Sequence, residues 1–259
     1  MVIKTNSIRA ITARRTVLEL ILSDHPQDCL LCEKNTVCEL QRLAGELGIR
    51  EIHYKGEMST YPIDNSSNSI VRDPNKCILC RRCETVCNEV QTVGVLSAVN
   101  RGFETVVSTA FSLPLRESTC TFCGQCVAVC PTGALTEVNN TSKVWDALSQ
   151  TEKVVVVQTA PAVRAALGEE FGLEQGTCVT GKMVAALRAL GFKKVFDTDF
   201  AADLTIMEEA SEFAHRLQHG GRLPMLTSCC PAWVNFFEHQ FDDLLDIPST
   251  CKSPQQMWG

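Results

Sequence analysis

The sequence predicts two fold classes within one chain: α+β modules rich in cysteine in the N-terminal half, and an α/β lobe built on a parallel sheet in the C-terminal half. The distribution of cysteine predicts the first part, because eleven of the fifteen cysteines lie in tight blocks before residue 131. Apolar strand-like runs that alternate with helical segments after residue 145 predict the second part. We expect modules at residues 1–56, 57–145 and 146–259.

Length, charge and cysteine usage narrow the class of protein. A chain of 259 residues is long enough for two or three small domains. Its net charge of −6 indicates no nucleic-acid partner, and no apolar run approaches the ~18 residues of a membrane span. An odd number of cysteines at C-x2-C spacing, without a secretory signal, predicts metal ligation in the reducing cytoplasm. The basic segment 1–20 is also compatible with a transit peptide, but it runs directly into candidate metal ligands.

Two cysteine motifs share one spacing. CILCRRCETVC (77–87) and CTFCGQCVAVC (120–130) both read C-x2-C-x2-C-x3-C, the bacterial ferredoxin pattern in which the fourth cysteine ligates the other cluster. We therefore predict a ferredoxin-like α+β module with two 4Fe-4S clusters. Their ligands are Cys77, Cys80, Cys83 and Cys130 at one site (the Cys77 site), and Cys120, Cys123, Cys126 and Cys87 at the other (the Cys120 site). Zinc ribbons are the alternative, and the doubled spacing argues against them.

The first cysteine block differs, because a histidine accompanies three cysteines. HPQDCLLCEKNTVC supplies His25, Cys29, Cys32 and Cys38, which we name the histidine site. Taken alone, this set suits zinc as well as a third 4Fe-4S cluster. Two further clusters downstream favour the iron–sulfur interpretation, since a third would extend an electron relay. Replacing an anionic thiolate with imidazole is expected to raise the cluster's reduction potential.

The C-terminal half alternates strand and helix patterns. Strands are expected at 153–159, 193–199 and 223–228, the first of them buried on both faces because it is a continuous β-branched run. Helices are expected at 160–172, 179–192, 203–219 and 231–239. In a parallel sheet the working residues collect at the carboxyl ends of strands. Cys229, Cys230 and the turn at 159–161 are predicted to lie there.

Seven segments together resemble a known family. They are SDHPQDCLLC, SIVRDPNKCILCRRC, CTFCGQCVAVCPTGAL, TAPAVR, DLTIMEEASE, TSCCPAW and KSPQQMWG. In this order they resemble the electron-relay domains and first catalytic lobe of an iron-only (FeFe) hydrogenase, close to the subunit type of NADP-reducing hydrogenases. The resemblance implies reversible oxidation of molecular hydrogen at an H-cluster, a 4Fe-4S cubane joined to a diiron subsite. It also implies that Cys230 ligates the cubane and that Cys229 exchanges the proton.

The resemblance also implies a proton path and a cofactor pocket. The path continues through Glu212, Ser249 and Glu209 toward Arg216, and Ala160, Pro161 and Gln255 surround the diiron subsite. Glu209, Glu212 and Arg216 share one flank of the predicted helix, opposite an apolar stripe of Met207, Ala210, Phe213 and Leu217. A surface ion-pair ladder is the alternative. A buried relay is expected to raise the carboxylate pKa values.

Other cysteines and histidines match no ligand position of the family. Cys178 and Cys251 are expected to be small buried hydrophobic residues. His53, His215, His219 and His239 receive no role.

The chain departs from the family in lacking two further segments that complete the H-cluster. We therefore expect an isolated chain to be inactive, and a second chain or a missing C-terminal region to supply the other ligands. A redox partner, either a ferredoxin or a flavin/NAD(P) subunit, is also expected. The alternatives are a non-catalytic electron-transfer subunit and a hydrogenase-like iron–sulfur assembly or sensory protein. The presence of Cys229, Glu209, Glu212 and Ser249 weighs against the last of these.

Overall fold

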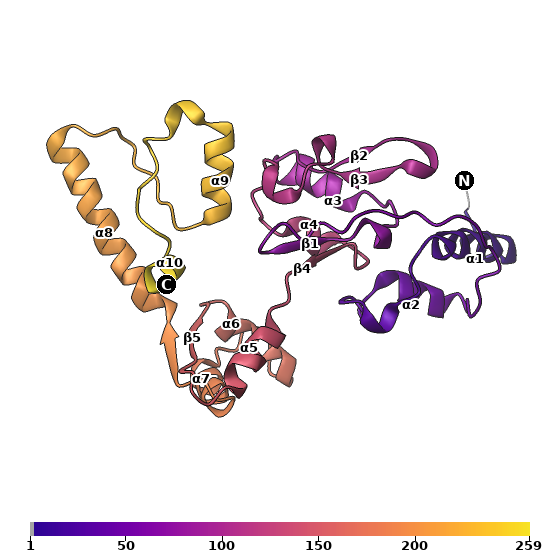
Figure 1. Cartoon of the computed structure of the whole chain (residues 1–259), viewed down its shortest axis with the longest axis horizontal. Coiled ribbons are helices and arrows are strands. Elements are labelled where there is room, and N and C mark those ends of the chain that lie inside the picture. Colours follow the sequence, from indigo (N-terminus) through magenta and orange to yellow (C-terminus); the bar gives the residue numbers. More distant parts are fainter. Residues whose placement is uncertain (1–2) are drawn as a thin grey trace. The chain divides into compact units, whose positions relative to one another are not determined.

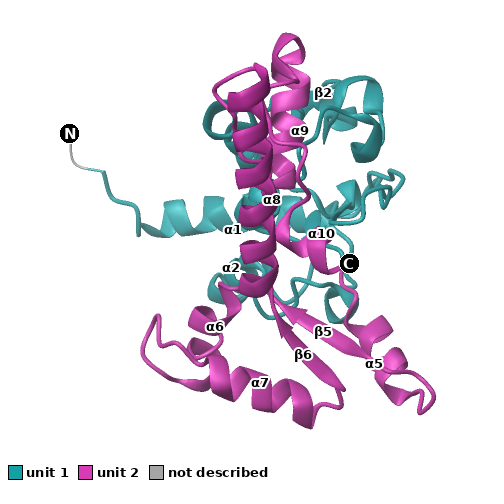
Figure 2. Ribbon diagram, turned by 90° about the vertical axis from the view of Figure 1, so that its left-hand side faces the viewer, with its two compact units in different colours: residues 1–138 teal, residues 139–259 magenta. Residues whose placement is uncertain are grey.

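The computed structural model describes residues 3–259 and divides the chain into two compact units, residues 1–138 and 139–259 (Figure 2). The helices and strands of both units are labelled in Figure 1. Among the described residues, no helix combines the length and apolar character needed to cross a bilayer.

Unit 1 is made of short helices and two small antiparallel sheets. Its helices are α1 (Ile8–Ser23), α2 (Glu39–Glu46), α3 (Arg82–Thr85), a π-helical turn (Val86–Val90) and α4 (Gln125–Val129). Its strands are β1 (Ile70–Arg72), β2 (Ser97–Val99), β3 (Val106–Ser108) and β4 (Leu135–Glu137). Strand β1 pairs with β4 and β2 with β3. The α+β character expected for this half is thus observed.

The core of unit 1 lies directly beneath the cysteine motifs. Its buried members are Ile70, Cys83, Val95, Leu96, Val107, Leu115, Val127 and Leu135. Besides the buried Cys83, five further motif cysteines pack against this cluster: Cys77, Cys87, Cys120, Cys126 and Cys130. Few apolar side chains form this core, so the cysteines contribute to it as well as pointing toward candidate metal sites.

Unit 2 combines a parallel strand pair with helices. Its elements are α5 (Thr141–Ser149), β5 (Val156–Thr159), α6 (Val163–Ala166), α7 (Thr180–Ala189), β6 (Lys194–Asp197), α8 (Thr198–His219), α9 (Pro231–Gln240) and α10 (Pro254–Trp258). Strands β5 and β6 are parallel, with Val156 opposite Lys194 and Thr159 opposite Asp197. Helix α7 ends before Gly191, whose φ of 108° is a conformation that glycine adopts readily at the end of a helix.

The expected third strand does not join this sheet. Within the described residues the sheet holds β5 and β6 alone, and Leu226 instead bridges Pro248. Leu226 N–H donates to the Ile247 carbonyl, and Ser249 N–H donates to the Leu226 carbonyl. The backbone N–H and C=O groups of Leu226 therefore pair with residues 247–249 and not with a strand of the sheet. Strand β5 is also not buried on both faces, because Val156 is 49% exposed.

Helix α8 presents the flank opposite to the one predicted. Met207, Phe213 and Leu217 of the expected apolar stripe are exposed. Arg216 is only 11% exposed, because its guanidinium donates to the carbonyls of residues 246–248. The bonds of this arginine to the three carbonyls thus decide which side of the helix the rest of unit 2 covers.

The short helix α10 forms because it has partners. Ser253 caps it, because its Oγ accepts a hydrogen bond from Gln256 N–H. The backbone N–H of Ser253 in turn donates to Gln256 Oε1. Trp258 stacks on Phe196 and Phe200 and donates from Nε1 to the Asp197 carbonyl. This packing fixes the KSPQQMWG segment beside the end of β6 and the start of α8.

Candidate metal centres and active site

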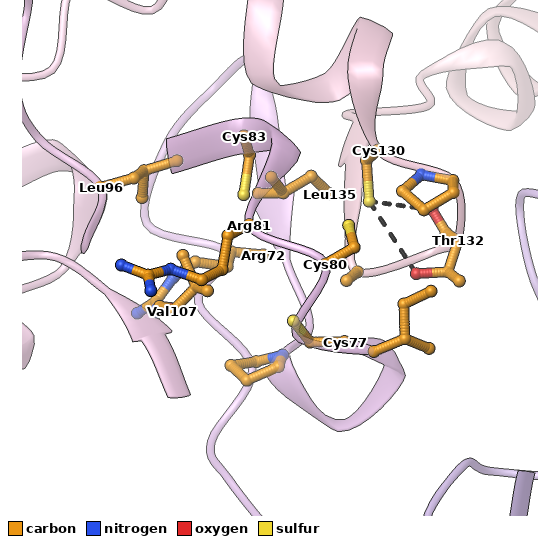
Figure 3. Close-up of a pocket in the computed structure, with 14 residues that line it drawn as sticks. Arg72, Cys77, Cys80, Arg81, Cys83, Leu96, Val107, Cys130, Thr132 and Leu135 are labelled. Atoms are coloured by element: carbon orange, nitrogen blue, oxygen red, sulfur yellow. Dashed lines mark hydrogen bonds between the residues drawn. The ribbon is translucent and has the colours of Figure 1, made fainter. Parts of the chain in front are cut away.

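The four predicted ligands of the Cys77 site line one cavity. Figure 3 shows the sulfur atoms of Cys77, Cys80, Cys83 and Cys130 turned toward the same space. Cys77 and Cys80 come from the loop before α3, Cys83 lies in α3 itself, and Cys130 follows α4. The exchange of the fourth cysteine between motifs, which the spacing predicts, is therefore reproduced in the arrangement of the side chains.

A second cavity brings together the Cys120 site. Cys120, Cys123 and Cys126 line it with Cys87, which lies on the π-helical turn of the other motif. The two cavities thus exchange one ligand each. Their linings differ in charge, because Arg72 and Arg81 border the first cavity, whereas the second is bordered by apolar and neutral residues.

The two loops adopt one backbone conformation. In each, the residue before the second cysteine and the residue after it have positive φ: Leu79 (55°), Arg81 (59°), Phe122 (56°) and Gly124 (77°). This curl points backbone N–H groups at sulfur, with Leu79 N 3.4 Å from Cys77 Sγ and Phe122 N 3.4 Å from Cys120 Sγ. Left-handed backbone is unfavourable for leucine and phenylalanine. Its repetition at matched positions indicates loops shaped to surround a bound group.

The thiols of these cavities need a cationic partner to ionise. Burial, and then the nearby Cys77 and Cys130 sulfurs, raise the pKa of Cys83 to about 12. Burial and the neighbouring cysteines likewise raise the pKa of Cys126 to about 12. A thiol with such a pKa stays protonated at neutral pH, and it becomes a thiolate only when bound iron supplies positive charge. Both cavities therefore fit iron–sulfur clusters.

The histidine site also forms one cavity, lined by His25, Cys29, Cys32 and Cys38. His25 Nδ1 is buried and has no hydrogen-bond partner. Burial lowers the pKa of His25, so the imidazole is neutral at pH 7 and has a lone pair to offer a metal. Among the described residues, no three or more His, Cys, Asp or Glu side chains lie close enough together to coordinate one metal ion.

Sequence reasoning missed Gly133 as part of the histidine site. A Cβ atom at this position would lie 2.5 Å from Cys32 Sγ, so only glycine permits the sulfur to rest on this backbone. The neighbouring Pro131 carbonyl accepts a hydrogen bond from Glu39 N–H, next to Cys38. The signal was present in CPTGAL, where a glycine follows the last motif cysteine.

A larger cavity lies at the carboxyl ends of β5 and β6. Its volume is about 570 Å³. Its lining includes the predicted residues Ala160, Pro161, Cys229 and Gln255, joined by Thr198, Asp199 and Ser253 from the start of α8 and the cap of α10. Cys230, by contrast, is not among its lining residues and is exposed at the N-terminal cap of α9. The structure therefore gathers the predicted pocket around Cys229 but leaves Cys230 outside it.

The predicted proton-path residues lie along one side of α8. Glu209 Oε1 accepts a hydrogen bond from Ser228 N–H, beside Cys229. Ser249 Oγ donates to Glu212 Oε2 at 2.7 Å, and Arg216 donates to Glu212 Oε1. These contacts join Glu209 to the residue before Cys229 and Ser249 to Glu212, and the order of a proton path through these residues stays a prediction.

The expectation of raised carboxylate pKa values is wrong for Glu212. Burial opposes its charge, but hydrogen bonds from Ser249, Arg216 and Thr250 lower the pKa of Glu212 below its usual value. Glu212 is therefore an anion at neutral pH. The pair with Arg216 is not the surface ladder considered as the alternative, because the two side chains are 20% and 11% exposed.

The remaining two cysteines differ from the expectation of buried hydrophobic residues. Cys178 is exposed, and a hydrogen bond with Thr180 lowers its pKa. Cys251 is half-buried, and its backbone N–H donates to Ser249 Oγ. Neither lines one of the four cavities.

Three sequence families match successive parts of the chain. Residues 14–53 match the NADH-ubiquinone oxidoreductase-G iron-sulfur binding region, and residues 76–134 match the 4Fe-4S dicluster domain. Residues 153–259 match the C-terminal domain of the iron only hydrogenase large subunit. These matches and the cysteine cavities define an iron–sulfur oxidoreductase polypeptide.

Several hydrogenase subunits are similar to the chain in sequence. The chain is 66% identical over its full length to the NADP-reducing hydrogenase subunit HndD of Solidesulfovibrio fructosivorans, and 38% identical to iron hydrogenase 1 of Clostridium pasteurianum. It covers 45% of each of these relatives. A segment comprising 40% of the chain is 50% identical to the periplasmic [Fe] hydrogenase large subunit of Nitratidesulfovibrio vulgaris and covers 25% of it. The chain is similar to iron-only hydrogenase large subunits, and it spans less than half of the length of these relatives.

Proposed function

We propose that this chain is the electron-relay part and first catalytic lobe of an iron-only hydrogenase that oxidises molecular hydrogen reversibly. The observation that carries the proposal is that twelve predicted ligands, eleven cysteines and one histidine, line three cavities as three sets of four. Three 4Fe-4S clusters, one of them with a histidine ligand, account for these sets. The module boundaries at residues 56 and 145 are part of the proposal.

In the catalytic lobe, the residues present suit the proposed pocket. Cys229 lines the cavity beside Ala160, Pro161 and Gln255. Bound at this lobe, an H-cluster would supply the redox chemistry of hydrogen, with Cys230 as one ligand of its cubane. The thiol of Cys229 holds a proton at the cavity wall, and Glu209 stands next in line toward Ser249 and Glu212.

The remaining cubane ligands would come from another chain or a further segment. Cys230 is exposed, and none of the four cavities gathers it with other cysteines. A single thiolate does not hold a cubane that requires four ligands. The redox partner would be a ferredoxin or a flavin/NAD(P) subunit, as the NADP-reducing name of the 66% identical relative suggests. A cytoplasmic location is part of the same proposal.

Hydrogen turnover tests the proposal directly. The chain is matured with and without a second chain that carries the further ligand segments, and hydrogen evolution is assayed. We expect activity only in the combination, and its loss on substitution C230S. C178S is the matched control, because Cys178 lies outside every proposed ligand set. Absence of activity in all combinations, or full activity of C230S, contradicts the proposal.

The exposure of Cys230 favours a second candidate, an electron-transfer subunit that forms no H-cluster. The two are separated by counting iron in the assembled complex. About twelve irons per chain, from three four-iron clusters, without an H-cluster signal in electron paramagnetic resonance would favour the carrier. Additional iron that depends on Cys230 would favour the hydrogenase.

A further inference from the structure

A lysine lies in the seam between the histidine site and the Cys77 site. Lys76 immediately precedes Cys77, and its side chain is 15% exposed. Its Cδ atom lies 3.3 Å from the point that a Cβ of Gly133 would occupy, the same point that is 2.5 Å from Cys32 Sγ. The lysine stem therefore lies against the backbone on which Cys32 rests.

The ammonium group of Lys76 is anchored on both sides of this seam. Its Nζ lies 3.5 Å from Asp28 Oδ2, directly before Cys29 in the sequence, and 3.6 Å from Asp73 Oδ2 of the dicluster part. The backbone is fixed as well, because Thr132 Oγ1 donates to the Lys76 carbonyl at 2.7 Å. Few rotamers of the lysine satisfy these contacts, so its charge has a defined position.

Lys76 carries its charge at neutral pH. The carboxylates of Asp28 and Asp73, which lie 3.5 and 3.6 Å from Nζ, stabilise the ammonium form. This cation is thus held next to Asp28, which precedes the ligand Cys29, and its stem lies against the backbone on which Cys32 rests.

We propose that Lys76 is a positioning residue that holds a fixed positive charge beside the histidine site and raises the reduction potential of the cluster bound there. The inference rests on the proposed function, since it requires a cluster at this site. An electron added to a cluster increases its negative charge, so a nearby cation stabilises the reduced state more than the oxidised state. Low exposure limits the screening of this interaction by solvent and salt.

Asp28 and Asp73 act in the opposite direction. In the intact triad the ammonium offsets part of their charge. Removing the ammonium alone leaves two carboxylates next to the site, so both effects disfavour the added electron. Removing the Asp28 carboxylate leaves the cation less compensated, and the potential should rise.

A redox titration of the iron-loaded chain, followed by electron paramagnetic resonance of the histidine-ligated cluster, tests the proposal. For K76Q we expect a midpoint more negative by at least about 59 mV, a tenfold fall in the ratio of reduced to oxidised cluster for a one-electron couple. K76R keeps the charge and should restore most of the ratio. D28N should shift the ratio in the opposite direction.

Arg82 provides the matched control for a general charge effect. It forms a two-point ion pair with Glu39, which follows the ligand Cys38, but its side chain is 50% exposed. R82Q removes the same charge where water screens it, so its midpoint should change much less than that of K76Q. Equal shifts in R82Q and K76Q overturn the proposal, as does an unchanged midpoint in K76Q.

The outcome separates this inference from the proposed function. A histidine-site signal that is present but insensitive to K76Q and D28N refutes the role of Lys76 and leaves the cluster in place. A wild-type chain with no third cluster signal and no matching iron refutes the cluster itself. If K76Q loses the cluster, a comparison of D28N with the double variant D28N/K76Q decides, because a lower midpoint in the double variant supports the role of Lys76 and equal midpoints refute it.

Discussion

Substitution G133A should selectively damage the histidine site. The added Cβ would lie 2.5 Å from Cys32 Sγ and 3.3 Å from Lys76 Cδ. The first distance is roughly 1 Å shorter than a favourable contact between heavy atoms. The obstacle is the sulfur of a short side chain packed on backbone, which has little freedom to withdraw. We expect a destabilisation of about 1–3 kcal/mol, typical of overpacking, and displacement of Cys32 from the cavity.

Iron content, the three cluster signals and chemical unfolding measure this effect. We expect G133A to lose about four irons and the histidine-ligated signal, while the Cys77 and Cys120 clusters remain. The matched control is G45A in α2 of the same part of the chain, where a new Cβ meets nothing within 4 Å. Alanine there should stabilise by about 0.5–1 kcal/mol, as expected for a helix interior. Full iron and unchanged stability in G133A would refute the steric argument.

Three further predictions follow from the site geometry. C130S should abolish the cluster at the Cys77 site, and C87S should abolish the cluster at the Cys120 site. Electron paramagnetic resonance of each variant measures this outcome, and loss of the opposite cluster would contradict the exchange of ligands. Because the folded-state pKa of Glu212 is lowered, its stabilising contribution is present above pH 4.5, the usual value, and is lost as pH falls through the folded pKa. Urea unfolding between pH 3 and 6, with E212Q as a flat reference, checks this sign. R216K keeps the charge but loses the guanidinium contacts to residues 246–248, so it should destabilise unit 2 by about 1–3 kcal/mol in thermal unfolding, and a neutral result would contradict the role given to those bonds.

The relay sites could be predicted from sequence because their ligands are specified locally. Three of the four cysteines in each ferredoxin-type site lie within seven consecutive residues, and the spacing itself restricts the loop. The fourth ligand follows from the known exchange between paired motifs. Gly133 and Lys76 could not be recognised in this way, because each acts through a contact with a segment far away in the sequence. Gly133 lies about a hundred residues from Cys32, and Lys76 lies about fifty residues from Cys29.

Unit 2 was predicted less well because its arrangement depends on packing rather than periodicity. The pattern of α8 predicts Met207 and Phe213 as the covered side, yet both are exposed. Hydrogen bonds of Arg216 to carbonyls of residues 246–248 orient the helix instead. Segment 223–228 has strand composition, but it pairs with 247–249 and leaves β5 and β6 without a third strand. A strand-like pattern of apolar residues does not show which segment of the chain that strand will pair with.

The two adjacent thiols of TSCCPAW are separated by the backbone that carries them. Cys230 has φ −103° and ψ 107°, an extended conformation, directly before helix α9. In extended backbone, successive side chains point to opposite sides. In agreement with this alternation, Cys229 and Pro231 line the cavity and Cys230 does not. One thiol therefore faces the proposed pocket while its neighbour faces away, toward where further ligands would have to approach. A proton donor and a metal ligand can occupy consecutive positions without competing for the same place, which is the arrangement that the proposed division of roles between Cys229 and Cys230 requires.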